Sequence, residues 1–349
     1  MDNRKRRAVA WWLIAGIIMI VIEFFMGGVT RLTGSGLSIT EWKPIMGTLP
    51  PLNDADWNNA FDSYKNIAQF KFLNSHFTLS DFKFIFYWEW AHRLWARMLG
   101  VVFLIGFVYF LSKKYFDKGM IKPFAVLFLL GGVQGFIGWK MVESGLNDTD
   151  LYVKHTWLAT HFLSAVTLMC YTLWFALVLL IPPHRRAGSK GMVTASIGLI
   201  ALVYVQLAYG AFMAGLHAAK NAPTWPTING DWIPAGMGAN SWLHNPINVH
   251  FIHRGLAYLL LAGIILWFVY AGKQAKLAGE SLLSKSRWWP MVLVTVQVIL
   301  GIATVLTAPY IVFAKFGVFE TIAEFHQLVA LILMMSVVAN LYISGRRTA

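Results

Sequence analysis

Cysteine is nearly absent from this chain of 349 residues, whose single cysteine, Cys170, lies inside an apolar run. One cysteine cannot form an intrachain disulfide, so a disulfide-stapled fold is excluded, and so is a cysteine-rich metal site. A tightly held metal ion would therefore need histidine or carboxylate ligands.

Charged residues are also scarce. They make up 13% of the chain, against 57% hydrophobic residues, and the mean hydropathy is +0.57. An average soluble domain has about 25% charged residues, so the composition predicts a polytopic membrane protein. The formal net charge is +13, but the basic residues lie in short segments between apolar runs. We therefore expect a lipid bilayer as partner and no nucleic acid.

Eight apolar stretches are long enough to cross a hydrocarbon core, which takes about 20 residues. They run approximately over residues 8–29, 87–111, 123–141, 155–181, 192–216, 249–270, 288–308 and 318–343. The first follows a basic N-terminus, is too long for a signal peptide and lacks a small-residue cleavage site, so we expect an uncleaved span. The predicted fold class is an all-α polytopic membrane protein with eight transmembrane helices.

Lysine and arginine are distributed unevenly between the two sides of the membrane. Most of those in the connecting segments fall on one side, in the clusters 4–7, 113–122, 185–190, 273–287 and 346–347. The others lie mostly in two long loops, 30–86 and 217–248. The positive-inside rule therefore predicts cytoplasmic termini and external long loops, in the cell inner membrane.

Three features of the first half recur 161 to 165 residues later. The His-Arg pair at 92–93 recurs at 253–254, Gln-x-x-x-Gly at 134–138 recurs at 297–301, and His161 is matched by His326. Four spans separate the copies, so both insert with the same orientation. We expect two pseudo-symmetric four-helix bundles, 1–183 and 184–349, related by an axis along the membrane normal.

Four of the ten histidines, His92, His161, His253 and His326, lie near the starts of even-numbered spans, roughly 8–12 Å below the outer surface. Ionisable residues at such depth are costly and are candidates for function. A single one could equally serve a helix-to-helix hydrogen bond, but two matched pairs favour ligation. Two imidazoles in a four-helix bundle suit the axial positions of a haem iron. A zinc site would need further ligands, of which Glu89 alone is in place.

Glu89 lies three residues before His92, on the same face of a helix. A bare carboxylate at low dielectric can act as acid, base or electrostatic stabiliser, whereas a structural carboxylate would need a cation, which Arg93 could supply. The second half has His250 at the corresponding place. We therefore predict that Glu89 marks the half where chemistry occurs, with Glu23 as the second choice.

Arg93 and Arg254 directly follow the candidate ligands, and they would either bind haem propionates or extend to lipid headgroups. His250 is predicted to support His253 or to replace the acid, and His155 to lie at the membrane interface. The remaining histidines are expected in solvated loops: His76, His184, His217 and His244.

Several motifs in order resemble those of haem A synthase. They are GGVTRLTGSGLS at 27–38, EWAHR at 89–93, QGFIGWKMVESGL at 134–146, GAFMAG at 210–215, HR at 253–254 and HQ at 326–327. The likeness covers nearly the whole chain and is to the branch shared by mitochondria and many bacteria. Another branch carries paired cysteines in its outer loops, and this chain has none there, which excludes a mechanism using a loop thiol.

The resemblance implies an enzyme that oxidises the C8 methyl group of haem O to a formyl group, giving haem A for cytochrome oxidase. It implies that His92 and His161 hold the substrate haem O, that His253 and His326 hold a haem b, and that Glu89 is the catalytic acid. The implied partners are the haem O synthase that supplies the substrate, an unidentified electron donor and cytochrome oxidase assembly factors.

Two other functions compete with this one. A dihaem electron-transfer protein of the cytochrome b type would have two similar haem sites and no need for an unmatched acid. A membrane haem chaperone or exporter would have loose ligation and a large external loop rich in tryptophan. The first outer loop carries Trp42 and Trp57, which is weak support for the last.

Overall fold

The computed structural model describes residues 3–41, 46–186, 188–277, 282–312 and 315–345. These residues form helices joined by loops. The long helices are α1 (Asn3–Leu32), α3 (Leu79–Ser112), α4 (Ile121–Glu143), α5 (His155–Leu180), α6 (Lys190–Gly215), α7 (Pro246–Leu277), α9 (Trp288–Thr307) and α10 (Val318–Ile343). Two shorter helices are α2 (Asp54–Lys65) and α8 (Leu282–Ser286).

Within the part of the chain that the structure describes, eight helices are long and apolar enough to span a membrane, in the order predicted from the sequence. Their outward faces carry large apolar side chains, of which Leu266 is 71% and Leu129 66% exposed. Such surfaces are stable only against lipid, and helices satisfy their own backbone hydrogen bonds there. The prediction of an all-α membrane protein with eight spans is confirmed.

Helix α3 begins eight residues before the predicted span, at Leu79. Thr78 caps it with a capping box, in which its hydroxyl and the Asp81 carboxylate each bond the other's backbone N–H. The first turns alternate polar residues with Phe82, Ile85 and Phe86, which pack under the outer loop and not against lipid. Hydropathy alone cannot detect such a start, because the helix is amphipathic there.

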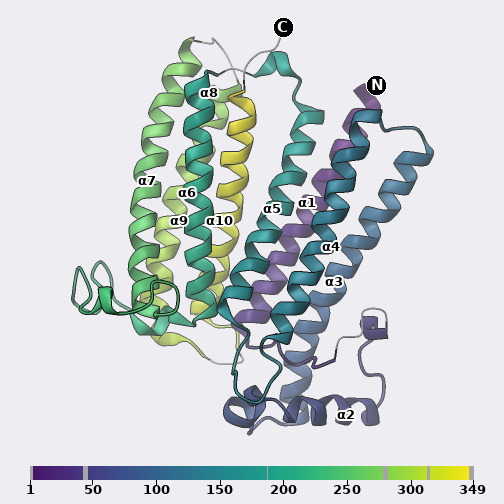
Figure 1. The fold of residues 1–349 in the computed structure, drawn as a ribbon, viewed down its shortest axis with the longest axis vertical. Coiled ribbons are helices and arrows are strands. Elements are labelled where there is room, and N and C mark those ends of the chain that lie inside the picture. Colours follow the sequence, from purple (N-terminus) through teal and green to yellow (C-terminus); the bar gives the residue numbers. More distant parts are fainter. Residues whose placement is uncertain (1–2, 42–45, 187, 278–281, 313–314, 346–349) are drawn as a thin grey trace.

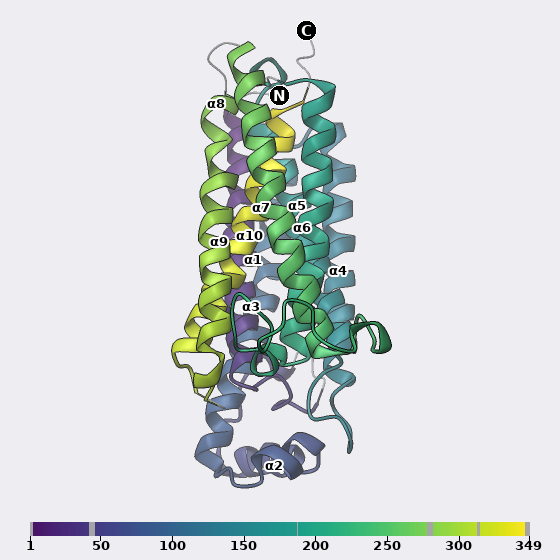
Figure 2. The same ribbon diagram turned by 90° about the vertical axis from the view of Figure 1, so that its left-hand side faces the viewer.

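The spans form two groups in Figure 1, one of α1, α3, α4 and α5 and the other of α6, α7, α9 and α10. Helix α1 starts and α10 finishes at the same end of the molecule, and the long loops gather at the opposite end (Figures 1 and 2). This arrangement agrees with the expected parallel repeat. The division into domains at residue 183 stays a prediction.

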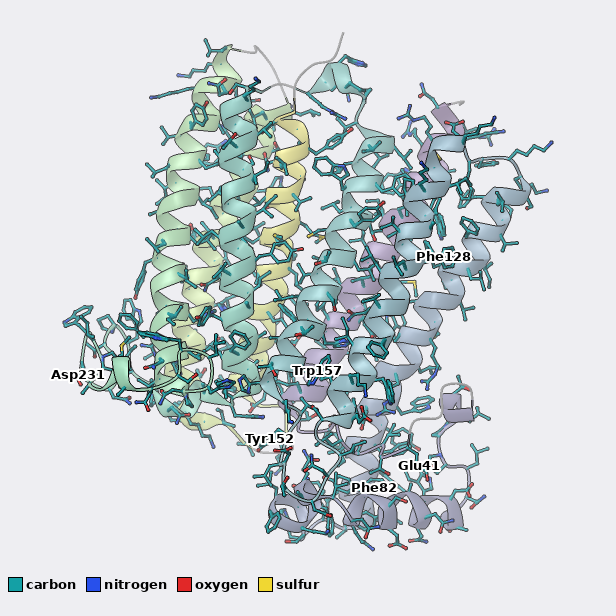
Figure 3. The ribbon with its side chains drawn as sticks, viewed as in Figure 1. Glu41, Phe82, Phe128, Tyr152, Trp157 and Asp231 are labelled. Carbon is teal, nitrogen blue, oxygen red and sulfur yellow. The ribbon has the colours of Figure 1, made fainter. Side chains whose placement is uncertain are left out.

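The long loop of the first half is folded and carries its own apolar core. Trp57, Phe61 and Tyr64 of α2 pack on Phe82 of α3, with ring centroids 5.0 to 6.4 Å apart. The buried Tyr64 hydroxyl donates to Gln69 and accepts from Asn74, and burial raises the pKa of Tyr64. Figure 3 shows Phe82 and Glu41 in this layer, beyond the end of the bundle.

The long loop of the second half, at the level of Asp231 in Figure 3, is fixed by side chains of α7. The buried Asn248 amide donates to the carbonyls of Met237, Asn240 and Ser241. The Asn248 side chain therefore fixes the loop over residues 237–241 by hydrogen bonds to its backbone.

The two groups of helices meet along α1, α5, α6 and α10. Gln327 of α10 donates to the Phe24 carbonyl of α1 at 3.0 Å, and Phe24 packs edge-on against Phe162 of α5. The hydrogen bond from Gln327 joins the two halves, and a cavity lies across both.

Candidate functional site

A cavity of about 800 Å³ runs through both helix groups. Its size falls within the range of roughly 300–1,000 Å³ of pockets that bind organic ligands. All four candidate imidazoles line it: His92 and His161 from the first group, His253 and His326 from the second. The structure thus brings together the histidines that the sequence singled out.

Each of these four imidazoles lies against a glycine of the preceding spanning helix. A Cβ atom placed on Gly138 would come within 2.7 Å of His161 Cε1, and one on Gly301 within 3.0 Å of His326 Cε1. The corresponding distances are 3.1 Å for Gly27 and His92 and 3.2 Å for Gly210 and His253. Glycine is required where a ring approaches a backbone so closely.

A side chain one helical turn before each glycine also faces the imidazole. Three of these residues are glutamines: Gln134 lies 3.2 Å from His161 Nδ1, Gln206 3.5 Å from His253 Nε2 and Gln297 3.3 Å from His326 Nε2. The fourth is a carboxylate. Oε1 of Glu23 lies 3.3 Å from Nδ1 of His92.

Each imidazole therefore belongs to a pair of consecutive spanning helices. The first helix carries Glu or Gln and, four residues later, Gly, and the second helix carries His. Residues four apart share one face of a helix, which is why the acid or amide and the glycine meet the same ring. The spacing was recognised in the sequence at 134–138 and 297–301, and the pairs at 23–27 on α1 and 206–210 on α6 have it as well.

The rings of His253 and His326 are separated by 6.4 Å between their centroids. An iron with a bond of about 2 Å to one nitrogen of each ring would hold the ring centres roughly 6 Å apart. Nδ1 of both rings is buried and makes no hydrogen bond to any described atom. The residues therefore fit a metal with two axial imidazoles, as in haem.

Zinc fits the site less well. Among the residues that the structure describes, no three His, Cys, Asp or Glu side chains come together as a metal site. The one cysteine, Cys170, is free. A haem supplies four equatorial nitrogens of its own, so it needs from the protein only the two imidazoles that are present.

Glu89 is 2% exposed, and its carboxylate is fully engaged. It accepts hydrogen bonds from the Ser38 hydroxyl at 2.6 Å, from the backbone N–H of Ile39 at 2.8 Å and from Arg93 at 2.5 Å. Arg93 also donates to the Ile39 carbonyl. Glu89 is thus paired with the cation next to it, and together they hold the segment that follows α1.

The second half repeats this clamp with different chemistry. His250, fully buried, donates from Nε2 to the Ala218 carbonyl at 2.8 Å. Arg254 donates to the carbonyls of Ala222, Thr224 and Thr227. His250 and Arg254 therefore hold the segment after α6 as Glu89 and Arg93 hold the segment after α1.

Both arginines line the cavity while holding these loops. Nε of Arg254 is a buried donor with no hydrogen-bond partner among the described residues. A ligand carboxylate entering the cavity could accept from it, since buried donors left unpaired are costly. Extension of Arg254 to lipid headgroups does not agree with its three loop contacts.

A second polar cluster, which sequence reasoning missed, lies between the halves. Arg31 of α1 donates from Nε to the Ala214 carbonyl of α6 at 3.1 Å. Glu324 of α10 is 3% exposed, and neither of its oxygens has a hydrogen-bond partner among the described residues. Both line the cavity. Arg31 lies inside the motif at 27–38, and this position is the sequence signal that could have identified it as a site residue.

His217 belongs to the same cluster, so the expectation that it is solvated was wrong. Its ring lies 3.9 Å from that of Tyr152 between centroids and lines the cavity. Burial, with a smaller contribution from Arg31, lowers the pKa of His217 to about 3. Burial raises the pKa of Tyr152. Figure 3 shows Tyr152 at the loop end of the bundle, between the halves.

The other histidines lie away from the four candidate ligands. His155, at the start of α5, bonds through Nε2 to Nδ1 of His244 at 2.9 Å. His76, His184 and His244 are exposed, as predicted.

Comparison with known proteins agrees with this arrangement. Residues 10–338 match the profile of a family described as cytochrome oxidase assembly protein, COX15-CtaA. The chain is 39% identical to the heme A synthase of Maricaulis maris over 353 aligned residues, covering 99% of this chain and 98% of the relative. It is 39% identical to that of Paracoccus denitrificans over 313, covering 87% and 81%.

A third relative, the heme A synthase of Sphingopyxis alaskensis, is 37% identical over 355 aligned residues, covering 98% of this chain and 93% of the relative. The likeness extends over all eight spans and both long loops. The chain therefore belongs to the cytochrome oxidase assembly protein family COX15-CtaA.

Proposed function

We propose that this membrane protein is a haem A synthase, an oxidoreductase that converts the C8 methyl group of haem O to the formyl group of haem A. Relatives named heme A synthase match most of the chain at 37 to 39% identity. The structural observation that carries the proposal is the cavity lined by two imidazoles from each half, each ring seated against a glycine.

The first half would hold the substrate haem O between His92 and His161. Glycine at 27 and 138 leaves room for the rings to turn toward a planar ligand lying between the helices. Gln134 bonds the His161 ring and fixes its orientation. Apolar side chains around the cavity exclude water and leave the farnesyl tail of haem O in contact with hydrocarbon.

The second half would hold a haem b between His253 and His326, whose ring separation suits an iron with two axial nitrogens. When bound, this group supplies one-electron redox chemistry. Gln206 and Gln297 orient the two rings, and the unpaired Arg254 Nε is placed to bind a propionate. Arg93 would contact the other haem in the same way.

Glu89 remains our candidate for the catalytic carboxylate, since it lines the cavity one helical turn from His92. Its carboxylate accepts hydrogen bonds from Ser38, Ile39 and Arg93. It would act as an electrostatic stabiliser or as a base, because an acid role would require Arg93 to release it first. Glu23, beside the His92 ring, is the second carboxylate of this site.

We place the protein in the cell inner membrane with both termini cytoplasmic and the cavity toward the outer face. The distribution of Lys and Arg and the position of the loops support this orientation. A haem O synthase would supply the substrate, and an electron-transfer partner would be needed for the oxidation. Factors of cytochrome oxidase assembly would receive the product.

Expression with a source of haem O, followed by extraction of the haems, tests the function. We expect haem A from the wild type and at least a tenfold smaller yield from Glu89→Ala. Absence of a formyl haem from the wild type would refute the enzyme, and an undiminished yield from Glu89→Ala would refute the role of this residue.

Spectra of the purified variants His92→Ala and His253→Ala test the assignment of haems to halves. Each variant should lose one haem and keep the other. Two spectroscopically equivalent haems without haem A formation would favour an electron-transfer protein of the cytochrome b type. Rapid loss of both haems to an acceptor protein would favour a haem chaperone or exporter.

A further inference from the structure

The four helix pairs share one plan, and one position in that plan differs. Gln134, Gln206 and Gln297 each stand one turn before the glycine that faces an imidazole, whereas α1 has Glu23 there. The three amides do not ionise, so among the four imidazoles that of His92 is the one with a carboxyl group at this position.

Glu23 and His92 have complementary unpaired atoms. Oε2 of Glu23 and Nδ1 of His92 are buried, and neither makes a hydrogen bond to a described atom, while Oε1 lies 3.3 Å from this Nδ1. Arg93, the nearest cation along α3, is bonded to Glu89. A small turn of the ring therefore gives both groups a partner, which buried polar atoms nearly always have.

A hydrogen bond from Nδ1–H to the carboxylate fixes the tautomer and leaves the Nε2 lone pair for a metal. It also increases the electron density on the ligating nitrogen, as do the carboxylate partners of metal-bound histidines in general. A glutamine oxygen can accept from an imidazole as well, but as a neutral acceptor it does so more weakly.

We infer that Glu23 is a positioning residue that bonds Nδ1 of His92 and makes this ring the strongest electron donor of the four imidazoles. A haem held by His92 then has a lower midpoint potential than one held in the second half. This inference rests on the proposed binding of a haem between His92 and His161.

Redox titration of the purified, haem-loaded protein tests it, with the two haems identified by the spectra of His92→Ala and His253→Ala. Glu23→Gln makes the first pair like the other three. We expect it to raise the ratio of reduced to oxidised haem in the first half about tenfold at a fixed potential, which corresponds to about 59 mV for one electron. The haem of the second half should keep its potential.

Gln297→Glu is the converse, because it places a carboxyl group beside the His326 ring, on the side of Nε2. It should lower the midpoint potential of the second haem and leave that of the first unchanged. It also decides the question if Glu23→Gln fails to fold. Electron paramagnetic resonance of the oxidised protein should show a changed signal for the altered haem alone.

Equal shifts of both haems would overturn the inference, because they would indicate a distant field effect and not a contact. An unchanged potential in both variants would overturn it too. Failure of the proposed function gives a different result, since His92→Ala would then retain both haems.

Discussion

The two halves are built from the same parts, yet they differ at two places. Outside the imidazoles, the first half clamps its loop with the ion pair of Glu89 and Arg93, while the second uses a neutral histidine, His250, beside Arg254. Beside the first imidazole, the first half has Glu23 and the second has Gln206.

This comparison changes the meaning of the sequence repeat. Aligned on the histidines alone, Glu89 and His250 are the visible difference and suggest that one half does the chemistry. In the structure both residues hold the segment that follows the preceding spanning helix. The carboxylate that touches an imidazole comes from the neighbouring helix, so an asymmetry between repeats has to be sought across a helix pair.

The largest effect should come from filling the space in front of an imidazole. Gly138→Leu would push His161 out of place, since even a Cβ comes within 2.7 Å of the ring. We expect at least a tenfold loss of haem from the first half and normal content in the second, measured as haem per purified chain. Gly301→Leu should do the reverse.

Gly198→Leu on α6 is the control for this pair, because a Cβ there meets no atom within 4 Å and the residue is exposed. It should keep both haems. Loss of both haems in Gly138→Leu would show that the halves do not bind independently.

Replacing Glu89 and replacing His250 should lower the free energy of unfolding by different amounts. Glu89→Gln leaves the half-buried Arg93 without its carboxylate, which costs about 3 kcal/mol by analogy with other buried ion pairs. His250→Gln can still donate to the Ala218 carbonyl and should cost about 1 kcal/mol. Thermal unfolding in detergent should therefore give a larger drop in Tm for the first variant. Equal drops would mean that the clamps are energetically alike.

The junction between the halves should be sensitive to acid through His217. Its pKa is about 3 when folded and about 6.5 when unfolded, so the unfolded chain binds the extra proton between these values. Stability should therefore fall as the pH drops below 6.5, by up to about 2 kcal/mol at pH 5. His217→Asn, which tolerates the positive φ of 48° found there, should show a shallower fall of Tm with pH.

The smallest effect is expected in the outer layer of the first half. Lys71 pairs with Asp148 at 2.8 Å, and both side chains are exposed. Exposed pairs contribute less than about 1 kcal/mol, so Lys71→Met should leave Tm and its pH dependence nearly unchanged. A large drop would show that charge, and not the aromatic core around Phe82, holds this layer.

Much of the architecture could be predicted from the sequence, because a bilayer restricts it. Span length and hydropathy gave eight helices, and α10 begins and ends at the predicted residues. The offset between His92 and His253 predicted the duplication. The similar depth of four histidines was also predicted, and in the structure they line one cavity.

The rest depends on contacts between segments far apart in the chain. The folding of the first long loop around Phe82, the packing of His217 against Tyr152 and the approach of Glu324 to Gly28 of α1 are tertiary contacts of polar or amphipathic segments. Glu23 looked unmatched because no histidine lies on its own helix. Its partner, His92, lies on α3, and a linear sequence does not show that α1 and α3 bring the two side chains together.

The glycine-facing histidines also reveal a finer repetition than the four-helix one. Each pair, α1 with α3, α4 with α5, α6 with α7 and α9 with α10, is a hairpin of consecutive spans that contributes one imidazole to the cavity. The loops between them differ so much in length that this periodicity is hidden in the sequence. The smallest repeating unit of the protein is thus a two-helix hairpin that carries one glycine-facing histidine.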